Sequence, residues 1–159
     1  KTAALLKTKP NQVPERVETM IEERRRLERE LSSLRRQDAT LEGNSADIKS
    51  INGISFLPKS LEGVPAKELK GLVDNFKNNL GSGVVAVVSK LDGKVNLVVG
   101  VSDDLTEKIN AVEMVRIGSN AVGGKGGGGR PDMAQAGGPA GENAQAALDA
   151  IRKALKNVK

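Results

Sequence analysis

The stretch VVAVVSKLDGKVNLVVGV, residues 84–101, decides how the chain folds. Two valine-rich runs, 84–91 and 94–101, flank the dipeptide Asp92-Gly93. This dipeptide is typical of a two-residue hairpin turn, because both central positions of that turn need a positive φ. The apolar run VVAVV indicates a strand that is buried on both faces of its sheet. The stretch therefore predicts a β-hairpin in the core of the fold.

The segments on either side of this hairpin complete an α/β pattern. Asn52-Gly53 lies between apolar residues and predicts an earlier hairpin of two short strands. Pro65 opens an amphipathic helix, a second helix begins near Leu105, and a third spans about 142–157. The order ββαββα, then a loop, then α predicts an α/β sandwich with a mostly antiparallel sheet covered by helices.

Residues 10–42 are predicted to form one long amphipathic, coiled-coil-like helix. Apolar residues recur there at alternating steps of three and four residues, which is the spacing of a heptad seam. Arg24 and Asp38 occupy two further seam positions, where polar residues weaken a coiled coil but fix its register or partner. The seam serves either self-association, which the spacing favours, or packing on the chain's own domain. We thus expect a helical subdomain, 1–45, and a globular subdomain, 46–159. The apolar seam residues are Val13, Val17, Met20, Leu27, Leu31, Leu34 and Leu41.

The composition excludes several classes of site. The 159 residues include no Cys and no His, so disulfides, Cys/His zinc sites and histidine-based catalytic sites are excluded. Tyr and Trp are also missing and there are 2 Phe, which argues against RNA binding by base stacking. A net charge of +5 favours acidic partners. With no signal peptide and no long apolar run, we expect a cytoplasmic piece of a longer protein, without membrane contact, metal or cofactor.

Residues 123–138 read GGKGGGGRPDMAQAGG and allow three interpretations. A nucleotide-binding GxGxxG motif is disfavoured, because that motif needs a strand before it and a helix at once after it. A flexible loop without a ligand is disfavoured, because Pro131 restrains both its own φ and the conformation of Arg130. The third interpretation is a backbone platform for nucleic acid. The bare amides of 123–129 can approach a phosphate or ribose closely, while Lys125 and Arg130 supply positive charge.

Taken with GVVAVVSKLDGKVNLVVGVSDDL (83–105), the motif GGKGGGGRPDMAQAGG closely resembles the C-terminal domain of bacterial alanyl-tRNA synthetase. The similarity extends from VPERVETMIEERRRLERELSSL (13–34) through the last helix, and so covers nearly the whole chain. The globular part is also similar to the substrate-binding domain of DHH-type phosphoesterases. The resemblance therefore implies an α/β sandwich of this DHH-associated type.

The resemblance also implies a function and a set of contact residues. It implies a non-catalytic module that docks on the elbow of tRNA(Ala) through the glycine-rich stretch and supports aminoacylation and editing, with a helical part for dimerisation. ATP and zinc would then belong to the aminoacylation and editing domains, which are missing from this chain. The alternatives are a dimerisation tail with only generic nucleic-acid affinity and a residual phosphodiesterase, which the lack of a metal-ligand cluster disfavours. The residues implied to contact RNA are Gly123, Gly124, Lys125, Gly126, Gly127, Gly128, Gly129, Arg130, Asp132, Gln135, Gly137 and Gly138.

Overall fold

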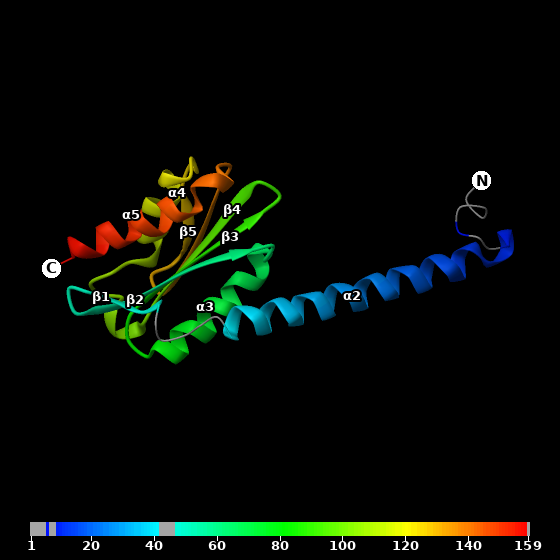
Figure 1. Ribbon diagram of the computed structural model, residues 1–159, viewed down its shortest axis with the longest axis horizontal. Coiled ribbons are helices and arrows are strands. Elements are labelled where there is room, and N and C mark those ends of the chain that lie inside the picture. The colour runs from blue at the N-terminus through cyan, green and yellow to red at the C-terminus, as the bar shows by residue number, and fades with distance from the viewer. Residues whose placement is uncertain (1–5, 7–8, 42–46, 159) are drawn as a thin grey trace. The chain divides into compact units, whose positions relative to one another are not determined.

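The computed structural model describes residues 6, 9–41 and 47–158, with the side chains of 32 and 35–41 left out (Figure 1). The chain divides into two compact units, 1–38 and 39–159, which we describe separately. The subdomain boundary expected at 45, and the predicted end of the first helix at Glu42-Gly43-Asn44, lie outside the described residues. Among the helices that the structure describes, none combines the length and the apolar character needed to cross a membrane.

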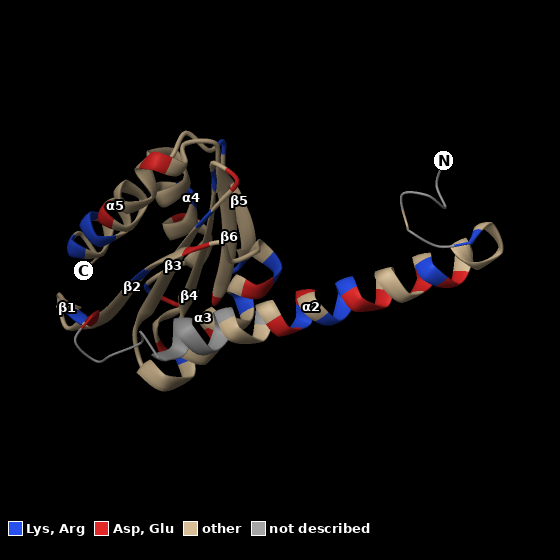
Figure 2. Ribbon diagram, turned by 45° about the vertical axis from the view of Figure 1, so that its right-hand side comes forward, with Lys and Arg blue, Asp and Glu red and all other residues tan. Residues whose placement is uncertain are grey.

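The first unit is a long helix, as the sequence predicts. A 3-10 turn, η1 (Pro10–Gln12), leads into α2 (Val13–Leu41). Proline is tolerated in these first turns because their amides lack helical partners. Acidic and basic residues are interspersed along α2 (Figure 2). Arg24 Nε lies 3.3 Å from Glu28 Oε1. The Leu41 side chain is not among those described and Val13 is half-buried. The other seam residues are 38–58% exposed: Val17, Met20, Leu27, Leu31 and Leu34.

The second unit is built on a six-stranded mixed sheet with the order β1-β2-β3-β4-β6-β5. Its β2–β3 pair is parallel, and the other four neighbouring pairs are antiparallel. The predicted, mostly antiparallel sheet is thus confirmed. The strands are β1 (Lys49–Ile51), β2 (Ile54–Glu62), β3 (Val84–Leu91), β4 (Lys94–Val101), β5 (Gly127–Arg130) and β6 (Met133–Gly138).

Both predicted hairpin turns are confirmed. Asn52 and Gly53 have φ values of 50° and 78°, and Asp92 and Gly93 have values of 50° and 74°. All five residues of the VVAVV run, 84–88, are fully buried, as its composition predicts. The first hairpin has one long strand where two short ones were predicted. β2 extends to nine residues because seven of them pair with β3 in parallel, which no local turn signal indicates.

Helices cover both faces of the sheet (Figure 1). Helix α3 (Ala66–Leu80) follows Pro65, ends at Gly81 and packs with Val85 and Val87 on one face. Helices α4 (Ala111–Ala121) and α5 (Ala144–Lys156) pack on the other face, where the alternate residues of β3 form a second core cluster. Strand side chains alternate between faces, so the central strands contribute to both clusters. The predicted α/β sandwich is confirmed.

Two predicted elements were wrong. The helix expected from Leu105 begins at Ala111, because the Asn110 side chain accepts a hydrogen bond from the Val112 amide at 2.9 Å and caps it there. Residues 103–105 form only a 3-10 turn, η3 (Asp103–Leu105). The stretch 123–138, expected as a loop, contains the hairpin β5–β6. Pairing of β6 with β4 overrides the low strand propensity of glycine.

Candidate nucleic-acid interface

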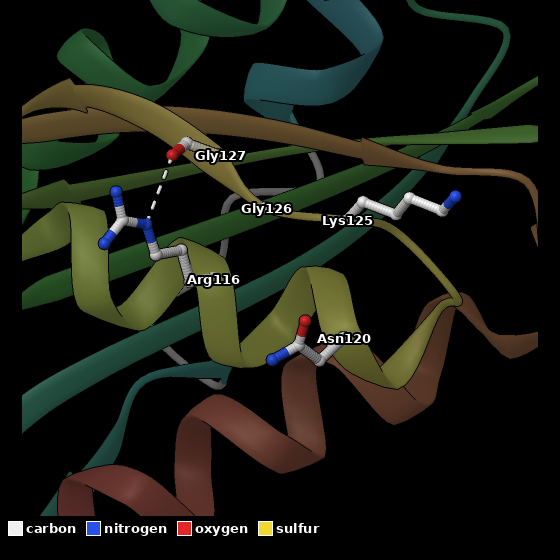
Figure 3. Close-up of a pocket in the computed structure, with 5 residues that line it drawn as sticks. All are labelled: Arg116, Asn120, Lys125, Gly126 and Gly127. Carbon is white, nitrogen blue, oxygen red and sulfur yellow. Dashed lines mark hydrogen bonds between the residues drawn. The ribbon is translucent and has the colours of Figure 1, made fainter.

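The structure brings the predicted RNA-contacting residues together at one edge of the sheet. Strand β5 is the outermost strand and pairs only with β6 among the described strands. Helix α4 runs beside this hairpin on one face (Figure 3). Gly123, Gly124, Lys125 and Gly126 connect α4 to β5; Gly127, Gly128, Gly129 and Arg130 form β5; Asp132 lies in the turn; Gln135, Gly137 and Gly138 belong to β6.

Most of the glycines in this stretch meet a structural demand. A Cβ on Gly124 would lie 2.2 Å from the Gly137 carbonyl oxygen and 2.2 Å from the Ser119 Oγ. Gly126 has open space but a φ of 133°, which side chains rarely adopt. Further close approaches exclude a Cβ at Gly127 (Ala136, 2.7 Å), Gly129 (Met133, 2.4 Å) and Gly138 (Val122, 2.5 Å). The absence of these side chains is therefore explained by the fold itself.

Within 123–129, Gly128 is the exception. It is exposed, no heavy atom lies within 4 Å of the Cβ that it would carry, and its φ is not in the positive region. Neither packing nor backbone conformation requires a glycine here. A glycine at an exposed edge, without a structural reason, is what a closely approaching backbone or base pair would require.

Gly128 belongs to an uncovered part of the sheet face on which α3 packs. Met133 of β6 packs in the α3 cluster, so Gln135 and Gly137 of the same strand point to that face. Gly128 lies opposite Gln135, and Asn96 of β4 lies opposite Gly137. An open pocket lined partly by Asn96, Gln135 and Gly137 lies on this surface. We call Asn96, Gly128, Arg130, Gln135 and Gly137 the hairpin platform.

Arg130 contributes the positive charge of the platform and is oriented by the hairpin turn. Its Nε lies 3.0 Å from Asp132 Oδ1 and its Nη2 lies 3.1 Å from Oδ2, while 76% of its side chain is exposed. Burial raises the pKa of Asp132, but the hydrogen bond and charge of Arg130, aided by Lys77, outweigh it and lower the pKa below its usual value. Asp132 is therefore ionised at neutral pH. It holds the guanidinium in place and leaves Nη1 unpaired among the described residues.

Ser119 connects helix α4 to the glycine-rich segment, and the sequence alone did not predict this role. It is fully buried on α4, and its Oγ lies 3.0 Å from the Gly126 carbonyl oxygen and 3.2 Å from that of Gly137. Its own carbonyl oxygen accepts a hydrogen bond from the Gly124 amide at 2.8 Å. One residue thus ties α4 to β6 and to the segment before β5. The sequence does carry one signal for this role. Ser119 is a small polar residue on the apolar face of α4, four positions after the buried Val115.

The groups at this edge of the sheet are cationic side chains, side-chain amides and the exposed backbone of glycines. Within the described ranges, no group of three or more Asp or Glu side chains is placed to hold a metal ion. Cations, amide donors and exposed backbone are the groups that proteins use to contact phosphate and sugar.

Comparisons with known proteins agree with this geometry. The DHHA1 domain family matches residues 53–157. An alanine–tRNA ligase of Paramagnetospirillum magneticum is 55% identical over 155 residues, which cover 98% of this chain and 18% of that protein. The chain thus spans less than a fifth of the length of this curated relative.

Two solved structures show the same fold. The crystal structure of the C-Ala domain from Aquifex aeolicus alanyl-tRNA synthetase is 31% identical with a TM-score of 0.65, and the match covers 69% of this chain and 98% of that one. RecJ from Thermus thermophilus, in complex with Mg²⁺, is 16% identical with a TM-score of 0.60, over 91% of this chain and 21% of that one. The second likeness is one of fold alone.

Proposed function

The chain belongs to the DHHA1 family and, within it, to the C-Ala domains of alanyl-tRNA synthetase, and we propose that it is a non-catalytic tRNA-binding module. It docks on the tRNA elbow through the hairpin platform. Its partners are tRNA(Ala) and the aminoacylation and editing domains of the same enzyme. ATP and zinc are bound by those domains, and this chain binds neither.

The observation that supports this proposal most directly is Gly128. Its neighbours in the glycine stretch are explained by packing or by a positive φ, whereas Gly128 is exposed and unconstrained. A side chain there would protrude from the platform beside Gln135, its cross-strand partner. The site therefore keeps a flat surface at the position where RNA makes its closest approach.

The platform suits the recognition of RNA shape better than the recognition of base sequence. Arg130 offers an Nη1 that has no partner among the described residues, and the exposed Gln135 and half-buried Asn96 offer amide groups. Such groups contact phosphates and 2′-hydroxyls, which are displayed on a wide and shallow RNA surface. The chain holds 2 Phe and no Tyr or Trp, so stacking on unpaired bases contributes little.

Helix α2 adds a second part to the proposal, which is dimerisation. Five of its seam residues are 38–58% exposed, and Ile21, which the heptad spacing did not include, is 43% exposed beside them. An apolar stripe at heptad spacing on an otherwise charged helix, interrupted here by Arg24 and Asp38, is the pattern of a coiled-coil seam. The alternative function, a dimerisation tail with generic affinity for nucleic acid, rests on the same stripe.

The experiment that separates these functions compares an intact tRNA with an acceptor-stem minihelix, which lacks the elbow. We expect the intact tRNA to bind at least about tenfold more tightly, a difference of roughly 1.4 kcal/mol, at every salt concentration. Binding is measured by filter retention or by anisotropy of a labelled RNA over a salt series. Equal affinity for the two RNAs, with a steep dependence on salt, would assign the binding to generic phosphate attraction and remove the elbow from the proposal.

A substitution at Gly128 tests the platform itself. We expect Gly128→Leu to weaken binding of intact tRNA by about tenfold or more, because the added side chain keeps RNA away from the bare strand. The free energy of unfolding should change by less than about 0.5 kcal/mol, as for an ordinary surface substitution. Ala146→Leu adds a similar side chain to the exposed face of α5 and serves as the control. Equal tRNA affinities for the two variants would show that RNA does not approach Gly128.

A further inference from the structure

A second cationic surface lies on the other face of β5, where α4 packs (Figure 3). It is an open pocket, and we call it the α4 pocket. Figure 3 shows Arg116 reaching toward Gly127, Asn120 one helical turn further along α4, and Lys125 at the far end of the pocket. The pocket is lined by Arg116, Asn120, Lys125, Gly126 and Gly127, a set that contains no carboxylate.

We propose that the α4 pocket binds the phosphate backbone of a second RNA segment, so that β5 is inserted between two segments of the same tRNA. This inference rests on the proposed function, because the first segment is the one that contacts the hairpin platform. A Cβ on Gly127 would lie 2.8 Å from Val115 of α4, whereas one on Gly128 would meet nothing within 4 Å. Successive residues of β5 therefore face the hairpin platform and the α4 pocket alternately. The glycine strand β5 separates these two surfaces.

Among the described residues, one contact positions a polar side chain of the α4 pocket, and its other polar groups have no protein partner. The Arg116 Nε donates to the Gly127 carbonyl oxygen at 3.4 Å, which orients the guanidinium along the strand. The other nitrogens of Arg116, the Lys125 ammonium and the Asn120 amide have no protein partner among the residues that the structure describes. Arg130 of the hairpin platform differs, since both of its bonded nitrogens contact the Asp132 carboxylate. Two unpaired cations around one pocket attract an anion.

The shape of the pocket favours a polymer over a small molecule. Small ligands are usually enclosed by their sites, whereas this pocket is open along the edge of the sheet. Arg116 and Lys125 lie toward opposite ends of it, with an amide between them (Figure 3). This arrangement matches a ligand that carries repeated negative charges, such as a phosphodiester chain. Gly126 and Gly127 have no side chain that would keep such a chain at a distance.

The test measures the affinity for intact tRNA over a salt series, using the double variant Arg116→Gln, Lys125→Gln. We expect the affinity at low salt to fall by about tenfold or more, and the slope of log K against log salt to become shallower by about one to two, as for the loss of one or two phosphate contacts. The single variant Lys125→Gln leaves the Arg116–Gly127 hydrogen bond intact and should lower the slope by about one. Far-UV circular dichroism verifies folding, since the chain has no Tyr or Trp for fluorescence.

The matched control removes the same charge elsewhere. Lys49→Gln, Lys153→Gln changes exposed lysines on β1, at the opposite edge of the sheet, and on α5. For this control variant, the slope of log K against log salt should equal that of the wild-type protein. If the pocket variant and this control behave alike, the α4 pocket is not an RNA contact and the inference is wrong. Displacement of tRNA by inorganic phosphate at constant ionic strength would also overturn it, because the pocket would then be a small-anion site.

The two proposals fail in different ways. If Gly128→Leu weakens binding and the pocket variant does not, the hairpin platform binds RNA and only the further inference is wrong. If neither variant weakens binding, RNA is held elsewhere and the proposed site is wrong as well. If both weaken binding, the loss of affinity in the combined variant Gly128→Leu, Lys125→Gln should equal the product of the two single losses within about twofold, because the two faces contact different RNA segments.

Discussion

Replacing Gly124 with alanine is expected to lower the free energy of unfolding by about 3 kcal/mol, at the upper end of the cost of overpacking a core. The added methyl group would lie 2.2 Å from both the Gly137 carbonyl oxygen and the Ser119 Oγ, and 3.1 Å from the Ser119 carbonyl oxygen. Two of these atoms are backbone, so a change of rotamer cannot relieve the contact. Urea unfolding followed by circular dichroism measures the effect.

The expected cost is large because Gly124 lies where three elements meet. Gly137 pairs with Asn96 of the central strand β4, so its carbonyl group cannot retreat without disturbing that pairing. Ser119 is buried on α4, and its side chain already contacts Gly126 and Gly137. Overpacking at this point should therefore weaken the attachment of β5 to the sheet, and with it the hairpin platform.

The control for this prediction is Gly128→Ala, four residues along the chain. Its methyl group would meet nothing within 4 Å, so the free energy of unfolding should stay within about 0.5 kcal/mol of the unchanged protein. Equal stability of the two variants would show that the junction of α4, β5 and β6 adjusts freely. The division of the glycine stretch into packed and unconstrained positions would then be wrong.

The parts of the fold that the sequence predicted are those with local signals. Asn52-Gly53 and Asp92-Gly93 specify their turns through positive φ at both positions, and no distant contact is needed for that. The VVAVV run specifies burial on both faces because it contains no polar residue. The heptad spacing specifies α2 in the same local way. These signals were sufficient for the fold class.

The parts that the sequence could not predict depend on distant partners. The parallel pairing of β2 with β3 joins segments separated by a whole helix. Strand β5 has no side-chain pattern at all, because glycines occupy 127–129; its strand conformation comes from pairing with β6. The start of α4 depends on a single cap at Asn110, which the apolar spacing around it obscured.

The candidate site was predicted as a segment, but not as a surface. The residues from Gly123 to Gly138 do gather at one edge, and their contact with RNA remains a prediction. What the sequence could not show is that the packed glycines and the unconstrained Gly128 have different reasons to be glycine. Nor could it show that Arg116, on a helix, lines the same pocket as Lys125 on the following segment.

The last prediction concerns the seam of α2 and has the largest expected effect on assembly. If the seam is the dimer interface, Leu27→Glu should weaken dimerisation by about 10²- to 10⁴-fold. Burial of one leucine contributes roughly 1.5–3 kcal/mol, and each protomer loses one. Glutamate is a good helix former, so the helix itself should persist. Sedimentation equilibrium over a range of concentrations measures the change.

The control Arg25→Gln removes one unit of positive charge beside the seam and should leave dimerisation unchanged. In the alternative arrangement, α2 packs on its own domain; the unchanged chain would then sediment as a monomer, and Leu27→Glu would lower the free energy of unfolding instead.

The same variant also separates the two parts of the proposed function. If the hairpin platform binds tRNA by itself, the Leu27→Glu protein should keep the affinity per protomer of the unchanged chain. If tRNA affinity disappears together with the dimer, avidity between two weak sites supplies the binding, and the platform alone is not a tRNA-binding module.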